Sequence, residues 1–594
     1  MQTSPLKEAI SEHVWHTKYQ WLEGGHMQEP SIEATWDRVA LAVSAVEVHH
    51  RNEWHERFRT LLRDFRFLPG GRILANAGTT RRATLFNCFV MGALEDSVQG
   101  IFNALREAML TLQAGGGVGV DFSTLRPAGS QAVASGGVAS GPASFMKVWE
   151  AANAVLEAGN LRRGAMMATL RCDHPDIEAF IQAKMVAGVL PHFNLSVLLT
   201  DEFMQALEVD GPWPLVFPLG SHPIPPGAEV CERVWSGAMA PQLCLVHKRI
   251  PARTLWDQLL EAELASAEPA ALFIDRINRA NNLWYCERIS TTNPCGEVPL
   301  APYGACNLGS INLARFVQHP FGAHPELDIA GIKAVAAVAT RFLDNVHDVS
   351  VFPVKAQEKA AHASRRLGLG VTGLADMFAM LGLRYGSPAS LELTREIMGV
   401  IRDTAYRTSV ELAREKGGFP DFDRVRYGAS PFVLQLPKDI QDAIAQHGIR
   451  NSHLLAVAPT GSISLLANNV SSGIEPIFAM KATRWIRGAD GQPISFEVQD
   501  AAVRHYRELH GPGAPLPAQF VSAVEVSAED QLHMMEAVQS CVDNAISKTV
   551  RLPASSTVHD MEMVLLRAWE LGLKGCAVYR EGSMSGASVV TTAQ

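Results

Sequence analysis

The sequence is poor in cysteine, and its cysteines form none of the usual metal or redox motifs. Nine cysteines are scattered over 594 residues, and no two stand in a C-x-x-C spacing. Structural zinc sites and thioredoxin-like dithiols depend on that spacing, so the sequence argues against both. An odd number of dispersed thiols favours a reduced protein without a disulfide framework, and we expect a cytoplasmic location.

Signals for export and for membranes are also missing. The first residues, MQTSPLKEAISEHVWH, lack the apolar core behind a basic end that a secretory signal has. No stretch approaches the ~18 continuous apolar residues of a membrane helix, so we expect no membrane partner. The formal net charge of −9 gives no electrostatic reason to expect a nucleic-acid polymer. Small phosphorylated ligands are not excluded, because backbone amides and helix N-termini bind them without a basic surface.

Two common nucleotide-binding motifs are absent as well. The glycine-rich stretch LQAGGGVGVDFS, residues 112–123, has Val120 where the third glycine of G-x-G-x-x-G would stand. The sequence contains no Gly-Lys dipeptide, so it has no Walker A loop. These absences argue against a standard dinucleotide oxidoreductase and against a P-loop ATPase.

What the sequence does contain is a helical start followed by an α/β pattern. Residues 31–48 place apolar side chains at steps of three or four, with Ser31 as a candidate N-cap, which predicts an amphipathic helix. Further on, short apolar segments such as HFNLSVLL, ALFID and HLLAVA alternate with helical stretches, which predicts an α/β sheet or barrel with helices outside. We expect a proline-rich surface loop at 212–230. The expected organisation is a helical region at 1–70, an α/β domain at 71–580 and a flexible tail at 581–594.

One predicted turn has the form of a phosphate-binding site. In HLLAVAPTGSISLLANNV an apolar strand ends, Pro459-Thr460-Gly461-Ser462 turns, and a helix is predicted to begin near Ser464. Exposed amides, small side chains and two hydroxyls near a helix start suit a phosphate group. An ordinary capped strand-to-helix turn has the same pattern, so both interpretations stay open at this point.

A cysteine and a glutamate stand close together in Asn293-Pro294-Cys295-Gly296-Glu297. The proline and the glycine disfavour a helix and favour a tight loop. Such a loop can present both groups to one small target, where the carboxylate could take a proton and contribute ~10²–10⁴ in rate. A carboxylate neighbour raises the pKa of a thiol, which is unfavourable for a thiolate nucleophile and harmless for an uncharged sulfur radical. A buried, inert cysteine is the alternative interpretation.

The segment NPCGE, followed by CNLGSINL, resembles the finger loop of ribonucleotide reductase catalytic subunits. Other segments, among them LFNCFVMGALEDSVQG, RRLGLGVTGLADMFAMLGLRYG and CVDNAISKTVRLP, are similar to segments of this family in the same order. The resemblance spans roughly residues 15–582. It implies a ten-stranded α/β barrel, built from two antiparallel-related five-stranded parallel half-sheets, with a central finger loop.

The resemblance also implies a role for each residue of the site. Cys295 would be the thiyl radical that removes the 3′-hydrogen of the ribose. Glu297 would accept the proton of the 3′-hydroxyl, and Asn293 would hold the ribose hydroxyls. Cys88 and Cys306 would be the dithiol that reduces the 2′-position and ends as a disulfide. The substrate phosphates would be bound by Pro459, Thr460, Gly461, Ser462, Ile463 and Ser464.

The family divides by the source of its radical. Oxygen-dependent large subunits use two adjacent tyrosines near the C-terminus, whereas no two of the eight tyrosines here are neighbours. The anaerobic type has a glycyl-radical segment similar to R-V-x-G-Y, which the ending KGCAVYREGSMSGAS lacks. The resemblance therefore implies adenosylcobalamin as cofactor, and without a D-x-H-x-x-G motif we do not predict histidine ligation to cobalt. The alternatives are an oxygen-dependent large subunit with a radical-generating partner and a non-catalytic nucleotide-binding paralogue.

Regulation and partners are likewise implied by resemblance. The positions that contact a deoxynucleoside triphosphate effector in relatives are matched by Asp96, Ser97 and Val98. A segment similar to the family's effector loop contains Arg162 and Arg163. The alternative for these two arginines is a solvated basic pair. In relatives the effector site lies at a dimer interface, which implies a homodimer.

No segment resembles the family's N-terminal activity domain. The sequence has no cysteine after position 576, so a thioredoxin-like protein, or a separate small chain with a C-terminal cysteine pair, would restore the dithiol.

Overall fold

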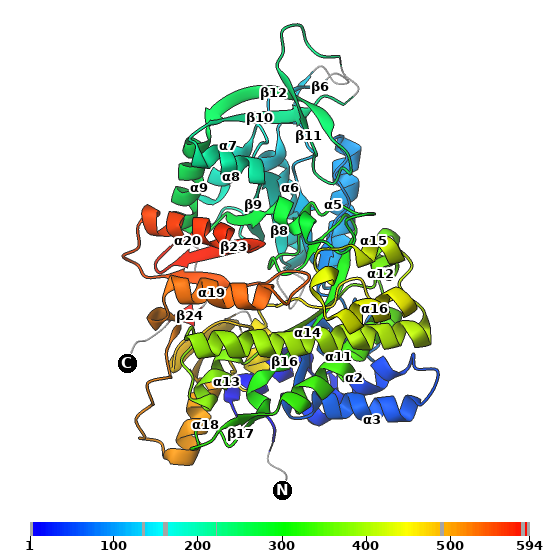
Figure 1. Cartoon of the computed structure of the whole chain (residues 1–594), viewed down its shortest axis with the longest axis vertical. Coiled ribbons are helices and arrows are strands. Elements are labelled where there is room, and N and C mark those ends of the chain that lie inside the picture. The colour runs from blue at the N-terminus through cyan, green and yellow to red at the C-terminus, as the bar shows by residue number, and fades with distance from the viewer. Residues whose placement is uncertain are drawn as a thin grey trace.

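The structure is a computed structural model of the chain. It describes residues 4–132, 137–157, 164–220, 223–487, 492–583 and 589–590. Figure 1 shows the chain with its N-terminal helices at one end and strands β10–β12 at the other. None of the helices in these ranges combines the length and the apolarity that a membrane crossing requires.

The N-terminal part is helical, as the sequence predicts. Helix α2 (Ile32–Ser44) begins directly after Ser31, although the Ser31 side chain makes no capping hydrogen bond. Its apolar face is buried, and the helix packs against α3 (Arg51–Leu62). Both helices contact α11 (Ile329–Val349), which joins the N-terminal region to the rest of the chain.

One half of the central sheet consists of five neighbouring parallel strands. They run in the order β4 (Cys88–Val90), β5 (Gly117–Asp121), β8 (Met166–Arg171), β9 (Phe193–Leu199) and β13 (Ala270–Phe273). Nearly every residue of these strands is buried, because helices cover the outside and a loop fills the inside.

The other half also consists of parallel segments. Strand β16 (Ala305–Asn312) pairs with β19 (Leu367–Thr372), and β22 (Thr549–Leu552) pairs with β23 (Gly575–Arg580). The segment 454–457 fills the space between these pairs, with parallel bridges to β19 on one side and to Ile546 on the other. The predicted strand HLLAVA therefore takes part in the wall, although it forms only isolated bridges.

The two halves meet twice in antiparallel fashion and close the sheet into a barrel. Strand β16 pairs with β4 at one junction, and β23 pairs with β13 at the other. Within the described residues, nine named strands and the segment 454–457 make up the closed wall. The expected ten-stranded barrel of two antiparallel-related halves is confirmed.

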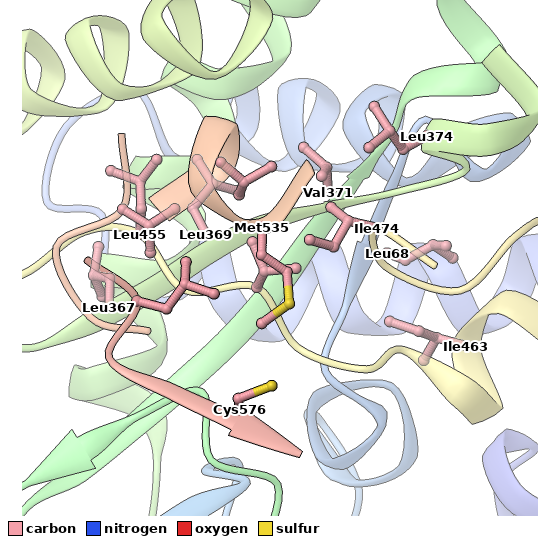
Figure 2. Packing of buried hydrophobic residues seen from close by; sticks show 14 of the residues in the cluster. Leu68, Leu367, Leu369, Val371, Leu374, Leu455, Ile463, Ile474, Met535 and Cys576 are labelled. Atoms are coloured by element: carbon pink, nitrogen blue, oxygen red, sulfur yellow. The ribbon is translucent and has the colours of Figure 1, made fainter. Parts of the chain in front are cut away.

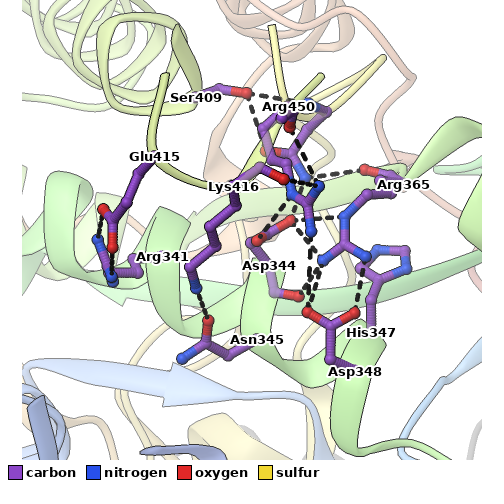
Figure 3. A network of polar contacts seen from close by, with 12 residues as sticks. Arg341, Asp344, Asn345, His347, Asp348, Arg365, Ser409, Glu415, Lys416 and Arg450 are labelled. Carbon is purple, nitrogen blue, oxygen red and sulfur yellow. Dashed lines mark hydrogen bonds and ion pairs between the residues drawn. The ribbon is translucent and has the colours of Figure 1, made fainter. Parts of the chain in front are cut away.

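A buried polar network ties α11 to the second half of the barrel (Figure 3). Arg365, just before β19, binds Asp344 and Asp348 of α11, with guanidinium to Asp348 carboxylate distances of 2.8 and 3.0 Å. Arg450, just before the segment 454–457, also reaches Asp344. Hydrophobic packing continues on the barrel side, where Figure 2 shows leucines of β19 beside Leu455. The network thus fixes where two neighbouring barrel segments begin.

The proline-rich stretch 212–230 is the one expected loop that the structure corrects. Its first part is strand β10 (Pro212–Pro218), which pairs with β12 (Gln242–Pro251) in a three-stranded antiparallel sheet completed by β11 (Val230–Arg233). Strand β10 lies at an edge of this sheet. Proline has no N–H to donate, and an edge strand tolerates it because one side of the strand has no partner.

Near the C-terminus, two residues of the segment expected to be a tail form a short strand. Strand β24 (Val589–Val590) pairs with β20 (Lys481–Arg487) at Thr483 and Arg484. Strand β20 is otherwise paired with β21 (Pro493–Gln499). This small sheet lies outside the barrel wall.

Candidate active site

The segment NPCGE forms the tip of a hairpin inside the barrel. Strand β14 (Thr291–Thr292) pairs with β15 (Pro299–Leu300), and residues 293–298 connect them. The hairpin contacts both halves of the wall. Asn194 of β9 donates to the Pro294 carbonyl at 2.8 Å, and the Ala545 amide donates to the Glu297 carbonyl at 2.9 Å. The tip is therefore held from two sides.

The glycine run of β5 makes room for this hairpin. A Cβ atom on Gly119 would lie 1.9 Å from the Thr292 carbonyl oxygen, and one on Gly117 would lie 3.0 Å from the Pro294 ring. Only glycine permits so close an approach of two backbones. At the tip itself, Gly296 has a φ of +85°, which allows the turn between Cys295 and Glu297. Sequence reasoning found no function for the glycine run, because its partner lies far away in the sequence.

Cys88 and Cys306 face each other across the junction of the two half-barrels. They are direct partners in the antiparallel pairing of β4 with β16. Both are free thiols, and both are almost fully buried in a small apolar cluster that includes Val298 and Leu300 of the hairpin. Burial, and next the neighbouring Glu297 charge, raises the pKa of the Cys88 thiol well above its usual value. Burial also raises the pKa of Cys306. Both thiols are therefore protonated at neutral pH.

Asn293 connects the hairpin tip to this thiol pair. Its side-chain amide donates to the Cys88 sulfur at 3.2 Å, and its carbonyl oxygen accepts from the Val298 amide at 2.9 Å. The Cys88 thiol in turn donates to Glu297 Oε1 at 3.8 Å. The structure thus brings Cys88, Asn293, Glu297 and Cys306 together, although the sequence separates them.

Glu297 is a buried carboxyl with an unused oxygen. Its side chain is 1% exposed, and Oε2 has no hydrogen-bond partner among the described residues. Burial disfavours the carboxylate more than the hydrogen bonds from Asn293 and Cys88 favour it, so the pKa of Glu297 is raised to about 7. A carboxyl with this pKa can both accept and release a proton at neutral pH.

Cys295 opens into a cavity next to the hairpin. The cavity has a volume of about 300 Å³, and Pro459, Lys574 and Cys576 also line it. The Cys295 side chain is accessible from this space while lying deep inside the barrel. Burial, and next the charge of Glu297, raises the pKa of its thiol above the usual value. The sulfur is therefore uncharged at neutral pH and reachable by a small molecule in the cavity.

Comparison with known proteins accounts for both the barrel and the N-terminal helices. Residues 86–579 match the barrel domain of ribonucleotide reductase, and residues 7–82 match its all-alpha domain. The chain belongs to the ribonucleotide reductase family. The recognition made from the finger-loop motif is confirmed.

Several relatives in this family are similar over most of the chain. The vitamin B12-dependent ribonucleoside-diphosphate reductase of Mycobacterium tuberculosis (strain CDC 1551 / Oshkosh) is 40% identical over 93% of this chain and 76% of its own length. The protein of the same name from Thermoplasma acidophilum is 34% identical over 98% of this chain and 71% of its own. The vitamin B12-dependent ribonucleotide reductase of Streptomyces clavuligerus is 27% identical over 86% of this chain and 58% of its own length.

In this reductase fold the expected phosphate loop lies beside the finger loop. Helix α17 (Gly461–Leu466) begins at Gly461 and not near Ser464, because Thr460 adopts the left-handed conformation with a φ of +55° and its carbonyl accepts from the Ser464 amide. Pro459 lines the same cavity as Cys295. The Ser462 hydroxyl accepts from Lys18 at 3.2 Å, which places one ammonium group at the loop.

The hydroxyls of the loop are largely engaged within the protein. Thr460 Oγ1 accepts from the Gly473 amide at 2.8 Å and contacts the Thr372 hydroxyl at 3.0 Å. Ser464 Oγ lies 2.9 Å from Ser472 Oγ. Any phosphate at this loop is therefore bound mainly by backbone amides and by Ser462.

The expected effector residues lie at the start of one long helix. Ser97 is the N-cap of α5 (Val98–Gln113) and accepts from the Gly100 amide. Asp96 forms an ion pair with Arg126 at 2.7 Å, and Val98 is exposed. Arg162 and Arg163 fall outside the described residues.

Arg366 is a site residue to which sequence reasoning gave no role. Its guanidinium is buried, donates to the Pro299 carbonyl at 2.9 Å and pairs with Glu287 at 2.5 Å. The Pro299 carbonyl belongs to the returning strand of the finger loop, so Arg366 fixes the base of the hairpin. The segment RRLGLG carried the family resemblance, but nothing in its pattern indicated that its arginine would bind a hairpin.

Proposed function

We propose that this chain reduces ribonucleoside diphosphates to 2′-deoxyribonucleoside diphosphates by thiyl-radical chemistry that adenosylcobalamin starts, for DNA precursor synthesis. The observation that carries this function is the gathering of two thiols, an amide and a carboxyl around the tip that presents Cys295. The relatives from M. tuberculosis and T. acidophilum are named as vitamin B12-dependent ribonucleoside-diphosphate reductases. Neither an oxygen-dependent large subunit nor a non-catalytic paralogue is favoured by these findings.

The reaction exchanges one hydroxyl for one hydrogen and needs two electrons. Cys295 removes the 3′-hydrogen of the ribose as an uncharged sulfur radical and returns a hydrogen at the end. Cys88 and Cys306 supply the two electrons and two protons, so that the 2′-hydroxyl leaves as water and the thiols become a disulfide. Their raised pKa values keep both protonated, which suits proton donors.

Glu297 and Asn293 hold and move the protons of the ribose hydroxyls. Glu297 accepts the proton of the 3′-hydroxyl through its carboxylate, and a pKa of about 7 makes this transfer reversible at neutral pH. Asn293 orients the ribose while it keeps the tip closed through the Val298 amide. The phosphates of the substrate lie at Pro459–Ser464, next to the same cavity.

The cavity beside Cys295 fits the adenosyl part of the proposed cofactor. Its volume of about 300 Å³ is of the size that small-molecule sites have, and its apolar lining around Leu195 and Leu272 suits a nucleoside. Lys574, whose pKa burial lowers to about 8, adds a polar group at the wall. When bound there, adenosylcobalamin would supply, by homolysis of its cobalt–carbon bond, the radical that Cys295 receives. Within the described ranges, no cluster of His, Cys, Asp or Glu is arranged to hold a metal ion.

A homodimer and effector binding are part of the proposal. Helices α5 and α6 (Pro142–Glu157) pack against each other and expose large apolar side chains. Such residues on neighbouring helices favour a protein interface. A second copy of the chain would cover them and bring the effector residues Asp96–Val98 to the interface. The exposed residues are Val98, Phe102, Leu110, Val148 and Val155.

Restoring the Cys88–Cys306 dithiol requires an external reductant. Both thiols are almost completely buried, so the reductant must reach them through the cavity or displace the hairpin. A thioredoxin-like protein, or a separate small chain with a C-terminal cysteine pair, fills this role in the proposal. Multiple turnover with thioredoxin alone, compared with a chemical dithiol, separates the two.

The proposed function is tested by product formation with the purified full chain. One ribonucleoside diphosphate and a chemical dithiol are supplied, with and without adenosylcobalamin, and deoxynucleotide is measured. Product only in the presence of adenosylcobalamin supports the function. Product in its absence, or only after addition of a radical-generating protein, contradicts it.

A further inference from the structure

A second cavity, of about 170 Å³, lies outside the barrel wall and is lined by two arginines. Arg484 comes from β20 and Arg551 from β22, while the segment 469–479 provides much of the remaining wall. The site residues that the family resemblance implies do not include these arginines, and the mechanism above does not use them.

Neither arginine has a counter-ion among the residues that the structure describes. Among the described residues, no carboxylate is paired with either guanidinium, and Arg484 Nε is buried without a hydrogen-bond partner there. Burial, and next the charge of Arg551, lowers the pKa of Arg484, so the two cations lie close enough to repel each other. Both arginines are half-buried, and charges that are partly withdrawn from water are normally paired, so this cationic pair favours an anionic ligand.

The two guanidinium groups are held in place by aromatic rings. Both lie over the ring of Phe478, at 5.8 Å for Arg484 and 4.6 Å for Arg551. Arg551 also approaches the Tyr579 ring at 5.7 Å. Rings at these distances attract cations and restrict how far the side chains can swing. The donors are thus preorganised for a ligand.

The two acidic residues in the lining contribute little free negative charge, for two different reasons. Glu475 accepts from Lys548 Nζ at 2.6 Å and from the Thr549 amide at 3.0 Å. Burial, and next the neighbouring carboxyl of Asp376, raises the pKa of Asp500 and favours its neutral form. The cavity therefore keeps a positive charge that its own carboxylates do not cancel.

We propose that Arg484 and Arg551 form a binding site for a phosphate group, separate from the loop Pro459–Ser464. Planar guanidinium forks match phosphate oxygens, and a space of about 170 Å³ accepts an inorganic phosphate or diphosphate but not a whole nucleotide. Ser472 lines the cavity, and its hydroxyl touches Ser464 of the loop at 2.9 Å. The two sites therefore share a wall.

Calorimetric titration of the full chain tests this site directly. Inorganic phosphate and inorganic diphosphate are titrated at constant ionic strength, with a ribonucleoside diphosphate present at saturation to fill the loop. Saturable binding is expected, and Arg484→Gln or Arg551→Gln is expected to weaken it by about 10-fold or more. Lys481→Gln is the matched control, because this exposed cation of the same strand is paired with Glu497 at 3.0 Å. Unchanged binding in the arginine variants, or binding that the nucleotide abolishes, overturns the proposal.

Thermal unfolding separates a binding role from a structural one. Without phosphate, Arg484→Gln is expected to unfold at about the same temperature as the wild type, because the like-charge repulsion that it removes offsets the lost contact with the Phe478 ring. With phosphate, the wild type is expected to gain stability and the variant is not. A lower unfolding temperature of the variant without phosphate makes the arginine structural and overturns the proposal. Neither readout depends on reductase activity.

Discussion

Cys88 and Cys306 are direct cross-strand partners at one of the two junctions between the half-barrels. Opposed residues of antiparallel strands have Cα atoms about 4.5–5.5 Å apart, which lies within the range that disulfides require. The fold therefore places two thiols where oxidation joins them without moving the backbone far. The same junction faces the tip of the finger loop, because Asn293 reaches the Cys88 sulfur.

A single turnover is expected to join these two cysteines. Without added dithiol, each reduced chain should form about one deoxynucleotide and then stop, because the dithiol holds two electrons. Peptide mapping by mass spectrometry should find residues 88 and 306 linked. Cys244→Ser, which removes a buried thiol of β12 in the separate three-stranded sheet, should leave this unchanged, whereas Cys88→Ser should prevent it. Product beyond one equivalent without reductant would speak against the pair as the electron source.

The rate is expected to depend on the protonation of Glu297. Its raised pKa of about 7 means that the carboxylate needed to accept the 3′-hydroxyl proton is lost as the pH falls through neutrality. Turnover of the wild type should therefore decrease below pH 7. Glu297→Gln should lower turnover by about 10²–10⁴-fold and abolish this dependence. An unchanged pH profile in Glu297→Gln would assign the titration to another group.

The same carboxyl is expected to affect stability with the opposite trend in pH. The native state keeps the Glu297 proton up to a pH of about 7, while the unfolded chain releases it near 4.5, so this group favours the native state fully only at low pH. Its contribution is lost as the pH rises from 4.5 to 7, by roughly 3 kcal/mol in total. Glu297→Gln should therefore unfold at a higher temperature than the wild type at pH 8, and the difference should shrink at pH 5.

Asn293 is expected to act on turnover beyond its effect on stability. Asn293→Ala removes the bond to Cys88 and the acceptor for the Val298 amide. Asn345→Ala is the matched control, because this buried side chain also makes hydrogen bonds through both its amide and its oxygen, to Val43, Glu47 and Lys416. Both variants should lose about 1–3 kcal/mol of stability. Only Asn293→Ala should lower kcat, and equal kcat values in the two variants would leave Asn293 with a structural role alone.

Gly119 is expected to be essential for the position of the finger loop. An added Cβ atom would lie 1.9 Å from the Thr292 carbonyl oxygen, so Gly119→Ala must displace one backbone or the other. A shift of about 1 Å at the tip is enough to lower the rate by about 10²-fold. Gly399→Ala is the control, since nothing lies within 4 Å of its added Cβ in the middle of helix α14 (Pro388–Lys416). That variant should gain about 0.4–1 kcal/mol and keep full activity.

Sequence reasoning identified the parts of the fold that depend on local pattern. Alternating strands and helices predicted an α/β sheet or barrel, and proline and glycine around Cys295 predicted a loop. Strand β10 was expected to be a loop, because its prolines suggest a break. The structure shows these prolines in an edge strand, and one side of an edge strand has no partner that would need an N–H donor. Whether a strand lies at an edge is a property of the whole sheet and cannot be read from the strand alone.

The parts of the site that depend on contacts between distant segments could not be derived from residue patterns. The glycine run of β5 matches no nucleotide motif, and its purpose is visible only when the hairpin at Thr292 lies against it. Arg366 likewise has no sequence signal that links it to Pro299. The pairing of Cys88 with Cys306 was implied by family resemblance, since no spacing rule joins residues so far apart.

The most direct test of the account is the substitution Cys295→Ser in the purified full chain. Serine keeps the size of the side chain but cannot form a stable radical at this position, so nucleotide binding should remain near normal. The account predicts no deoxynucleotide from this variant in the presence of adenosylcobalamin, a ribonucleoside diphosphate and a chemical dithiol, under conditions in which the wild type turns over. Deoxynucleotide formed by Cys295→Ser at a measurable rate would contradict it.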